Sequence, residues 1–249
     1  MLDVKNILDS FDSLGLEQIP EDAFNVRRDT KYLANINVLG TLLDALKDQW
    51  NILEVDGLRQ HFYVSWYYDD AELTSFYDHL KERNNRQKFR LRKYQNEHAF
   101  FEIKTKNNKG ITEKDRLKLT NDKLHNIPVD FVKENSPRDV EKLEENIEVQ
   151  YKRITLYHKV NNEKITIDTS IHFKEDEQTK SYNNLLILEL KQEAFDKNIE
   201  TKNLLRDIGL RLNSCSKYCL GILNLREDVR HNRFKARLRI LEKIEKEAV

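Results

Sequence analysis

The feature that most limits how this chain can fold is an alternation of charged and uncharged side chains with a period of two. Arg86, Lys88, Arg90 and Arg92 occupy every second position of one segment. Residues i, i+2 and i+4 of a β-strand point to the same side, so this segment predicts a strand with an unbroken cationic face. A solvated outer face is the ordinary explanation for a polar row. However, like charges about 7 Å apart repel one another unless an anion lies among them.

Five further segments show the same design, with one face uncharged and the other carrying mostly basic residues. A closed barrel of about eight strands has an interior wide enough for side chains or one small ligand. Cationic rows on that inside predict a site for a linear, multiply charged anion, because Arg grips phosphate oxygens with a planar fork and Lys adds a mobile charge. The charged residues of these segments are Arg27, Asp29, Lys31, Glu102, Lys104, Lys106, Arg153, Lys164, Asp168, Glu189 and Lys191.

Three carboxylates lie among these cations, namely Glu102, Asp168 and Glu189. Buried charges are usually paired or bind metals. The carboxylates are therefore either counter-charges for Arg and Lys or ligands for a hard divalent ion that bridges phosphates. The residues alone leave both interpretations open.

The wider pattern predicts an α+β fold with a strand-rich centre and helices at the ends and in one insertion. With only 6 Gly and 3 Pro in 249 residues, no flexible linker is indicated, and we expect a single domain over residues 1–249. Strands are predicted at 25–33, 53–69 (two), 88–94, 99–106, 150–159, 163–173 and 184–191, and helices at 3–16, 37–50, 71–83, 111–149 and 201–248.

Charge and composition limit the partners and the compartment. The 43 basic and 43 acidic residues cancel, which argues against a general nucleic-acid binder. A basic segment at 230–243 could contact nucleic acid, but a solvated amphipathic helix is the favoured interpretation. Two cysteines, no apolar run of membrane-spanning length and no signal peptide predict a cytoplasmic protein. The seven histidines lack metal-ligand spacing, and we expect them to be structural or at the surface.

Eight stretches of the chain, taken in order, resemble the VTC domain, the catalytic domain of the vacuolar transporter chaperone polyphosphate polymerases. That domain is one of the triphosphate tunnel metalloenzymes, which are related to CYTH proteins. No stretch is decisive alone, but the ordered set is specific. The stretches are RRDTKY (27–32), YVSWYYDD (63–70), HLKERNNRQKFRLRKY (79–94), FFEIKTKNNKGITEKDR (101–116), YKRITLYH (151–158), KITIDTSI (164–171), LLILELK (185–191) and SCSKYCLG (214–221).

The resemblance implies an eight-stranded antiparallel β-barrel, a tunnel with flanking helices that binds ATP, triphosphate or polyphosphate. It implies a transfer of the γ-phosphate of ATP to phosphate or to a growing polyphosphate chain, with Mn²⁺ or Mg²⁺ as the cofactor. Glu189 resembles the metal ligand, with Glu102 and Asp168 as further candidates. The phosphate-binding candidates are Arg27, Lys31, Arg86, Lys88, Arg90, Arg92, Lys104, Lys106, Arg153, Lys164, Lys191, Ser216 and Lys217, of which Arg90, Arg92, Lys104, Arg153 and Lys217 are also the catalytic candidates.

Two positions depart from the family pattern, because Asp70 replaces an expected Thr and Lys164 replaces a usual Arg. The membrane helices of the eukaryotic proteins are not found in this sequence, so coupling to transport would require a separate membrane protein. An inorganic triphosphatase with the same tunnel and a non-catalytic polyphosphate-binding module remain as alternatives.

Overall fold

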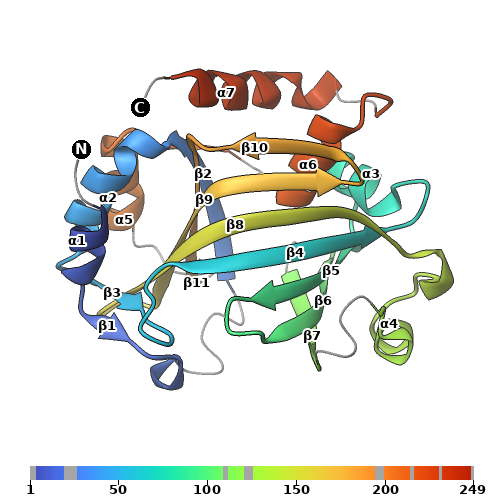
Figure 1. Ribbon diagram of the computed structural model, residues 1–249, viewed down its shortest axis with the longest axis horizontal. Coiled ribbons are helices and arrows are strands. Elements are labelled where there is room, and N and C mark those ends of the chain that lie inside the picture. The colour runs from blue at the N-terminus through green and yellow to red at the C-terminus, as the bar shows by residue number, and fades with distance from the viewer. Residues whose placement is uncertain are drawn as a thin grey trace.

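A computed structural model describes residues 4–19, 27–108, 112–120, 126–193, 199–213, 216–229 and 232–247 of the chain. Its centre is a twelve-stranded sheet whose main path runs β12-β2-β11-β9-β8-β4-β5-β6-β7 (Figure 1). All pairs on this path are antiparallel. The strands are β1 Ser13–Leu14, β2 Arg27–Asn35, β3 Trp50–Leu53, β4 His61–Asp69, β5 Arg86–Tyr94, β6 Ala99–Lys106, β7 Thr112–Leu119, β8 Glu144–His158, β9 Glu163–Glu175, β10 Gln178–Tyr182, β11 Leu185–Glu193 and β12 Arg211–Leu212.

The sheet is rolled, but no hydrogen bonds among the described residues close it. Its path ends at β7 on one side and β12 on the other. Nevertheless, Lys104 Nζ on β6 lies 3.7 Å from Asp29 Oδ2 on β2, so side chains from distant strands meet on the concave side of the sheet, which we call the hollow. The α+β class is confirmed, whereas the prediction of a closed barrel of eight strands is wrong in both closure and count. Strand twist rolls a sheet, but register and length decide whether its edges meet.

Helices cover the outer face of the sheet and one end of its inner face. Residues of α1, α2 and α5 pack on the outer sides of β8, β9 and β11, and α4 packs on β5 and β6. In contrast, α6 and α7 join a core with inward residues of β8 and β9. The helices are α1 Val4–Asp9, α2 Leu39–Leu46, α3 Thr74–Leu80, α4 Val129–Asn135, α5 Glu200–Asp207, α6 Lys217–Leu225 and α7 Lys235–Lys246. No helix in the described ranges is long and apolar enough to cross a membrane.

The largest error in the predicted elements concerns 111–149, which we expected to be helical. Within it, β7 forms an edge strand, α4 is a helix of 7 residues, and β8 begins at Glu144. In β7 only Leu117 and Leu119 contribute apolar contacts to the core, so its alternation is masked by charged residues on both faces. The helix expected at 3–16 is also shorter, because α1 ends at Asp9 and β1 follows.

Helix α6 lies unusually close to the inner face of the sheet. A side-chain carbon at Gly221 would collide with Ile147 of β8 and Phe173 of β9. Glycine therefore permits this approach, because a larger residue would require the helix or the side chains of Ile147 and Phe173 to move. The result is that α6 covers one end of the hollow.

Asp69, at the end of β4, fixes this arrangement through a buried hydrogen-bond network. Its carboxylate accepts from the backbone N–H groups of Ser75 (2.9 Å) and Phe76 (3.0 Å) at the start of α3. It also accepts from the Tyr218 hydroxyl of α6 at 2.6 Å. The adjacent Asp70 accepts from the Thr74 N–H at 2.8 Å. One carboxylate thus links β4, α3 and α6.

We predict that Tyr218→Phe lowers the free energy of unfolding by about 1–3 kcal/mol, because Asp69 would lose a buried donor. Urea unfolding followed by circular dichroism measures this change. Tyr68→Phe is the matched control, since the buried Tyr68 hydroxyl has no hydrogen-bond partner among the described residues. Equal stability of the two variants would contradict a structural role for the Tyr218–Asp69 hydrogen bond.

Candidate functional site

The first group of charged side chains inside the sheet surrounds Glu102. Its carboxylate is 1% exposed and lies 2.5 Å from Arg90 Nε and 2.5 Å from Lys114 Nζ. Burial by itself would raise the pKa of Glu102, but Arg90, Arg92 and Lys114 hold it well below its usual range. The carboxylate is therefore ionised and fixes Arg90 in the hollow.

A second group links β8, β9 and α6. Arg153 donates to Asp168 through Nε (2.6 Å) and Nη2 (2.8 Å), and the ammonium of Lys217 forms an ion pair with the same carboxylate. Burial opposes the charge of Asp168, yet Arg153 and Lys217 hold its pKa well below the usual value. This two-pronged arrangement fixes the direction of the guanidinium.

A third group joins β2, β11 and β6. Glu189 lies 2.8 Å from Lys191 Nζ and 3.7 Å from Lys31 Nζ. Asp29 lies 3.8 Å from the same Lys191 Nζ and 3.7 Å from Lys104 Nζ. Burial lowers the pKa of Lys104 to about 7. Glu189 opposes this shift, whereas the neighbouring Lys31 and Lys191 add to it. A bound polyanion would relieve this crowding of positive charge.

Lys88 and His79 form a fourth group beside α6. Lys88 Nζ lies 3.0 Å from His79 Nδ1 and donates to Ser216 Oγ at 3.0 Å. Burial, with Lys88 as the nearest of several cations, lowers the pKa of His79 to about 2, so the imidazole is neutral and accepts from the ammonium. Burial also lowers the pKa of Lys88 to about 8.

Two buried hydroxyls on the inner face have no hydrogen-bond partner in the described parts of the chain. They are Tyr151 Oη on β8 and Thr166 Oγ1 on β9. Tyr151 is fully buried, and Lys217 Nζ lies 4.7 Å from its ring centroid. Burial would raise the pKa of Tyr151, but Arg92 and Arg153 outweigh it and lower the pKa. Buried polar groups normally have partners, so these hydroxyls are suited to a ligand.

The site residues predicted from the sequence fall into those that converge on the concave side of the sheet and those at its margin. The cations of β5, β6, β8, β11 and α6 converge, and Arg92 is 7% exposed, donating to Ser65 Oγ at 3.3 Å. At the margin, Arg86 donates to the Arg83 carbonyl at 2.7 Å and Lys164 donates to Tyr157 Oη at 2.6 Å. Of the remaining predicted phosphate-binding positions, Lys106 lies at the half-buried end of β6, and the side chain of Arg27 lies outside the described part of the chain.

Several residues of the site were not predicted. Lys114 lies in the segment expected to be helical, and only its alternation with Arg116 could have revealed it. His79 belongs to a set that we expected to be structural or at the surface, and its approach to Lys88 has no sequence signal. Tyr151 shares the alternation of Arg153, but nothing in the sequence distinguishes its hydroxyl from other tyrosines.

The three predicted metal ligands do not form one group. No cluster of three or more His, Cys, Asp or Glu side chains able to hold a metal occurs among the described residues. Glu189 and Asp29, however, both lie against Lys191. Mg²⁺ and similar ions often bind one or two carboxylates together with waters and substrate phosphates. Glu189 with Asp29 therefore fits a divalent ion that is held jointly with a phosphate ligand.

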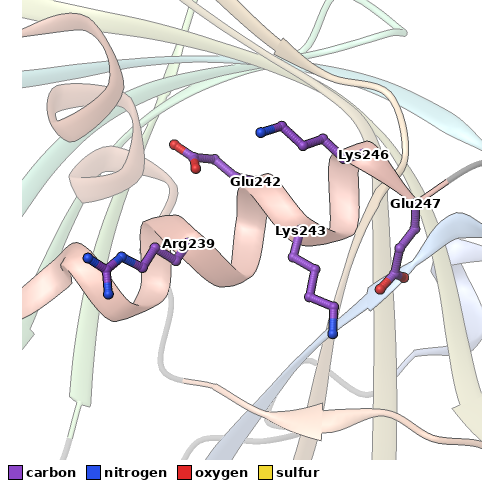
Figure 2. Close-up of a pocket in the computed structure, with 5 residues that line it drawn as sticks. All are labelled: Arg239, Glu242, Lys243, Lys246 and Glu247. Carbon is purple, nitrogen blue, oxygen red and sulfur yellow. The ribbon is translucent and has the colours of Figure 1, made fainter.

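The exterior of α7 carries a separate surface pocket of about 420 Å³. Figure 2 shows Lys243 and Glu247 on one side of the helix and Glu242 and Lys246 on the other, so the lining side chains do not converge on one point. The lining residues are Arg239, Glu242, Lys243, Lys246 and Glu247.

Comparisons with known structures place the fold. A candidate adenylate cyclase from Bacillus halodurans matches with a TM-score of 0.51 and 10% identity, over 77% of this chain and 94% of that chain. A candidate adenylyl cyclase from Hippeastrum, described as having a dominant triphosphatase activity, has a TM-score of 0.49 and 12% identity, over 79% and 95% of the chains. A Pyrococcus horikoshii protein has a TM-score of 0.47 and 13% identity, over 79% and 99%.

Comparison by sequence identifies the family. No protein of curated function matches the chain. The VTC domain model matches residues 26–226, a range that includes every cluster described above. The chain therefore belongs to the VTC domain family.

Proposed function

We propose that this protein is a polyphosphate polymerase that transfers the γ-phosphoryl group of ATP to phosphate or to the end of a polyphosphate chain. The observation that supports it most is the excess of convergent cations over carboxylates inside the rolled sheet, together with the unpartnered Tyr151 hydroxyl. Phosphoryl transfer needs positioning and charge neutralisation more than a covalent nucleophile. The inner face offers both.

The roles follow from the contacts. Arg90, Arg92 and Arg153 are held in fixed directions and suit the non-bridging phosphate oxygens, where charge is redistributed during transfer. Lys104, which is paired with Asp29, and Lys217, which is paired with Asp168, would neutralise further charge on the phosphate chain. The other cations of the clusters bind and align the substrate.

A divalent ion, Mn²⁺ or Mg²⁺, would be held by Glu189 and Asp29 and would neutralise charge on phosphate oxygens. These two carboxylates share Lys191, which can turn toward phosphate when the carboxylates bind a cation. Glu102 and Asp168 instead act as fixed counter-charges for the arginines.

The ionised state of the carboxylates favours phosphate over water as the acceptor. Glu102, Asp168 and Glu189 are each ion-paired, and neighbouring cations lower the pKa of all three. A carboxylate with a low pKa is a weak general base for water. A phosphate acceptor is already anionic and needs no base, which favours chain growth. Hydrolysis of triphosphate is the second candidate, because the unclosed edges of the sheet give water a further route to the hollow.

With ATP and Mn²⁺, the purified protein should form a ladder of polyphosphate chains on a polyacrylamide gel, and a parallel assay for free orthophosphate should show much less release. Orthophosphate release from inorganic triphosphate without a ladder would replace the polymerase by the triphosphatase. If neither polyphosphate nor orthophosphate forms, only the non-catalytic polyphosphate-binding module remains.

A change at Glu189 should affect the rate of polymer formation but should not lower the affinity for triphosphate. Glu189→Gln should reduce the rate of polymer formation about 100-fold, because the divalent ion that Glu189 would hold could no longer neutralise charge on the transferring group. Affinity for inorganic triphosphate, measured by calorimetry without metal, should hold or increase, since a negative charge leaves the site. Glu193→Gln, at an exposed position of the same strand, is the control. Loss of triphosphate binding in Glu189→Gln alone would contradict the assignment.

The affinity for triphosphate should depend on pH, because buried lysines lose their charge near neutral pH. Lys88 faces His79, Ser216, Lys31 and its own-strand neighbours, and burial lowers its pKa to about 8. An anion binds the charged forms of both Lys104 and Lys88, so affinity for triphosphate should decrease as pH rises through 7, where Lys104 loses its proton, and should show a second fall near pH 8 from Lys88. Lys88→Arg stays charged, so it should flatten this fall in calorimetric titrations. Lys152→Arg, on the exposed outer side of β8, should keep the wild-type profile; if Lys88→Arg does so too, Lys88 does not bind the anion.

A further inference from the structure

The inner face of β5 changes character along its length. Lys88 lies beside Ser216 at the end covered by α6, then Arg90 and Arg92 follow, and Tyr94 ends the strand. Inward side chains recur about every 7 Å. The row therefore passes from α6, through the phosphate-binding arginines, to an aromatic residue at the opposite end.

That end carries a stacked group outside the charged clusters. The guanidinium carbon of Arg116 on β7 lies 3.4 Å from the ring centroid of Phe100 on β6. An approach in the plane of the ring would collide with ring carbons, so the guanidinium lies over the face of Phe100. Tyr94 meets Phe100 edge-on, with ring centroids 5.8 Å apart and an interplanar angle of 83°.

This group is accessible and adjoins the cationic row. The Arg116 side chain is 41% exposed and lies 3.9 Å from Glu102, the carboxylate that holds Arg90. In the strand register, Phe100 is the direct partner of Arg92. The aromatic rings are half-buried, so they are fixed in place while one side of the stack faces solvent.

We propose that Phe100, Tyr94 and Arg116 bind the base of a nucleoside triphosphate whose phosphates lie along the cationic row of β5. Flat bases stack on aromatic rings and on guanidinium planes. The inference rests on the proposed function, because it takes the triphosphate to be bound in the hollow. It adds a place for the base of that donor, a group that an inorganic phosphate chain lacks.

The test compares two ligands with one protein. Phe100→Leu keeps apolar volume but removes the ring face, and Arg116→Lys keeps charge but removes the planar guanidinium. Calorimetry without metal gives the dissociation constants for the β,γ-imido analogue of ATP and for inorganic triphosphate. Phe100→Leu should weaken binding of the analogue about tenfold and leave that of triphosphate unchanged. Arg116→Lys should shift the ratio of the two constants in the same direction.

Arg211→Lys, at an exposed position on β12, is the control and should not change the ratio. Thermal unfolding of each variant identifies any loss of folded protein. If wild type binds triphosphate but the variants weaken both ligands equally, or neither, the base subsite is refuted and the proposed function stands. If wild type binds neither ligand, both are refuted.

Discussion

The fold depends on holding many positive charges side by side on the concave face of one sheet. Repulsion among them is offset locally by Asp29, Glu102, Asp168 and Glu189, each of which contacts at least two cations. Buried ion pairs contribute little net stability, because desolvation opposes their attraction. The stabilising term is therefore found on the other face, where aliphatic residues of β8, β9 and β11 are buried under α1, α2 and α5. This sheet is apolar on its convex side and charged on its concave side. The arrangement is possible because helices cover the apolar side.

Helix α6 connects these two requirements, because it is apolar along its length and charged at its start. Its buried face packs on Ile147 and Phe173, where the concave side is no longer charged. Its first turn then places Ser216 and Lys217 against Lys88 and the Asp168 carboxylate. The same helix thus supplies core packing that fixes the sheet and two polar groups that complete the site.

Alternation with a period of two was enough to predict most central strands and the concave position of Arg90, Arg92 and Arg153, because the opposite residues had to meet helices. It could not predict the roll or the edges of the sheet, which depend on register between distant strands. Lys104 and Asp29 are an example, since 75 positions separate them in the sequence although their side chains are 3.7 Å apart. His79 was missed for the same reason: its partner Lys88 comes from another element, and the burial that keeps it neutral is a tertiary property.

The carboxylates also set an upper limit on how tightly the hollow can hold its ligand. Cations without counter-charges would bind substrate, transition state and product alike, which slows release without speeding transfer. Paired cations are already fixed in direction, so they need little reorganisation when charge develops on the phosphoryl group. Asp168 illustrates both effects, because it orients Arg153 through two hydrogen bonds and would compete for Lys217 with the phosphate ligand that we propose. The chain-lengthening reaction that we propose would require this balance, since its product would carry more charge than its substrate and would still have to move through the site.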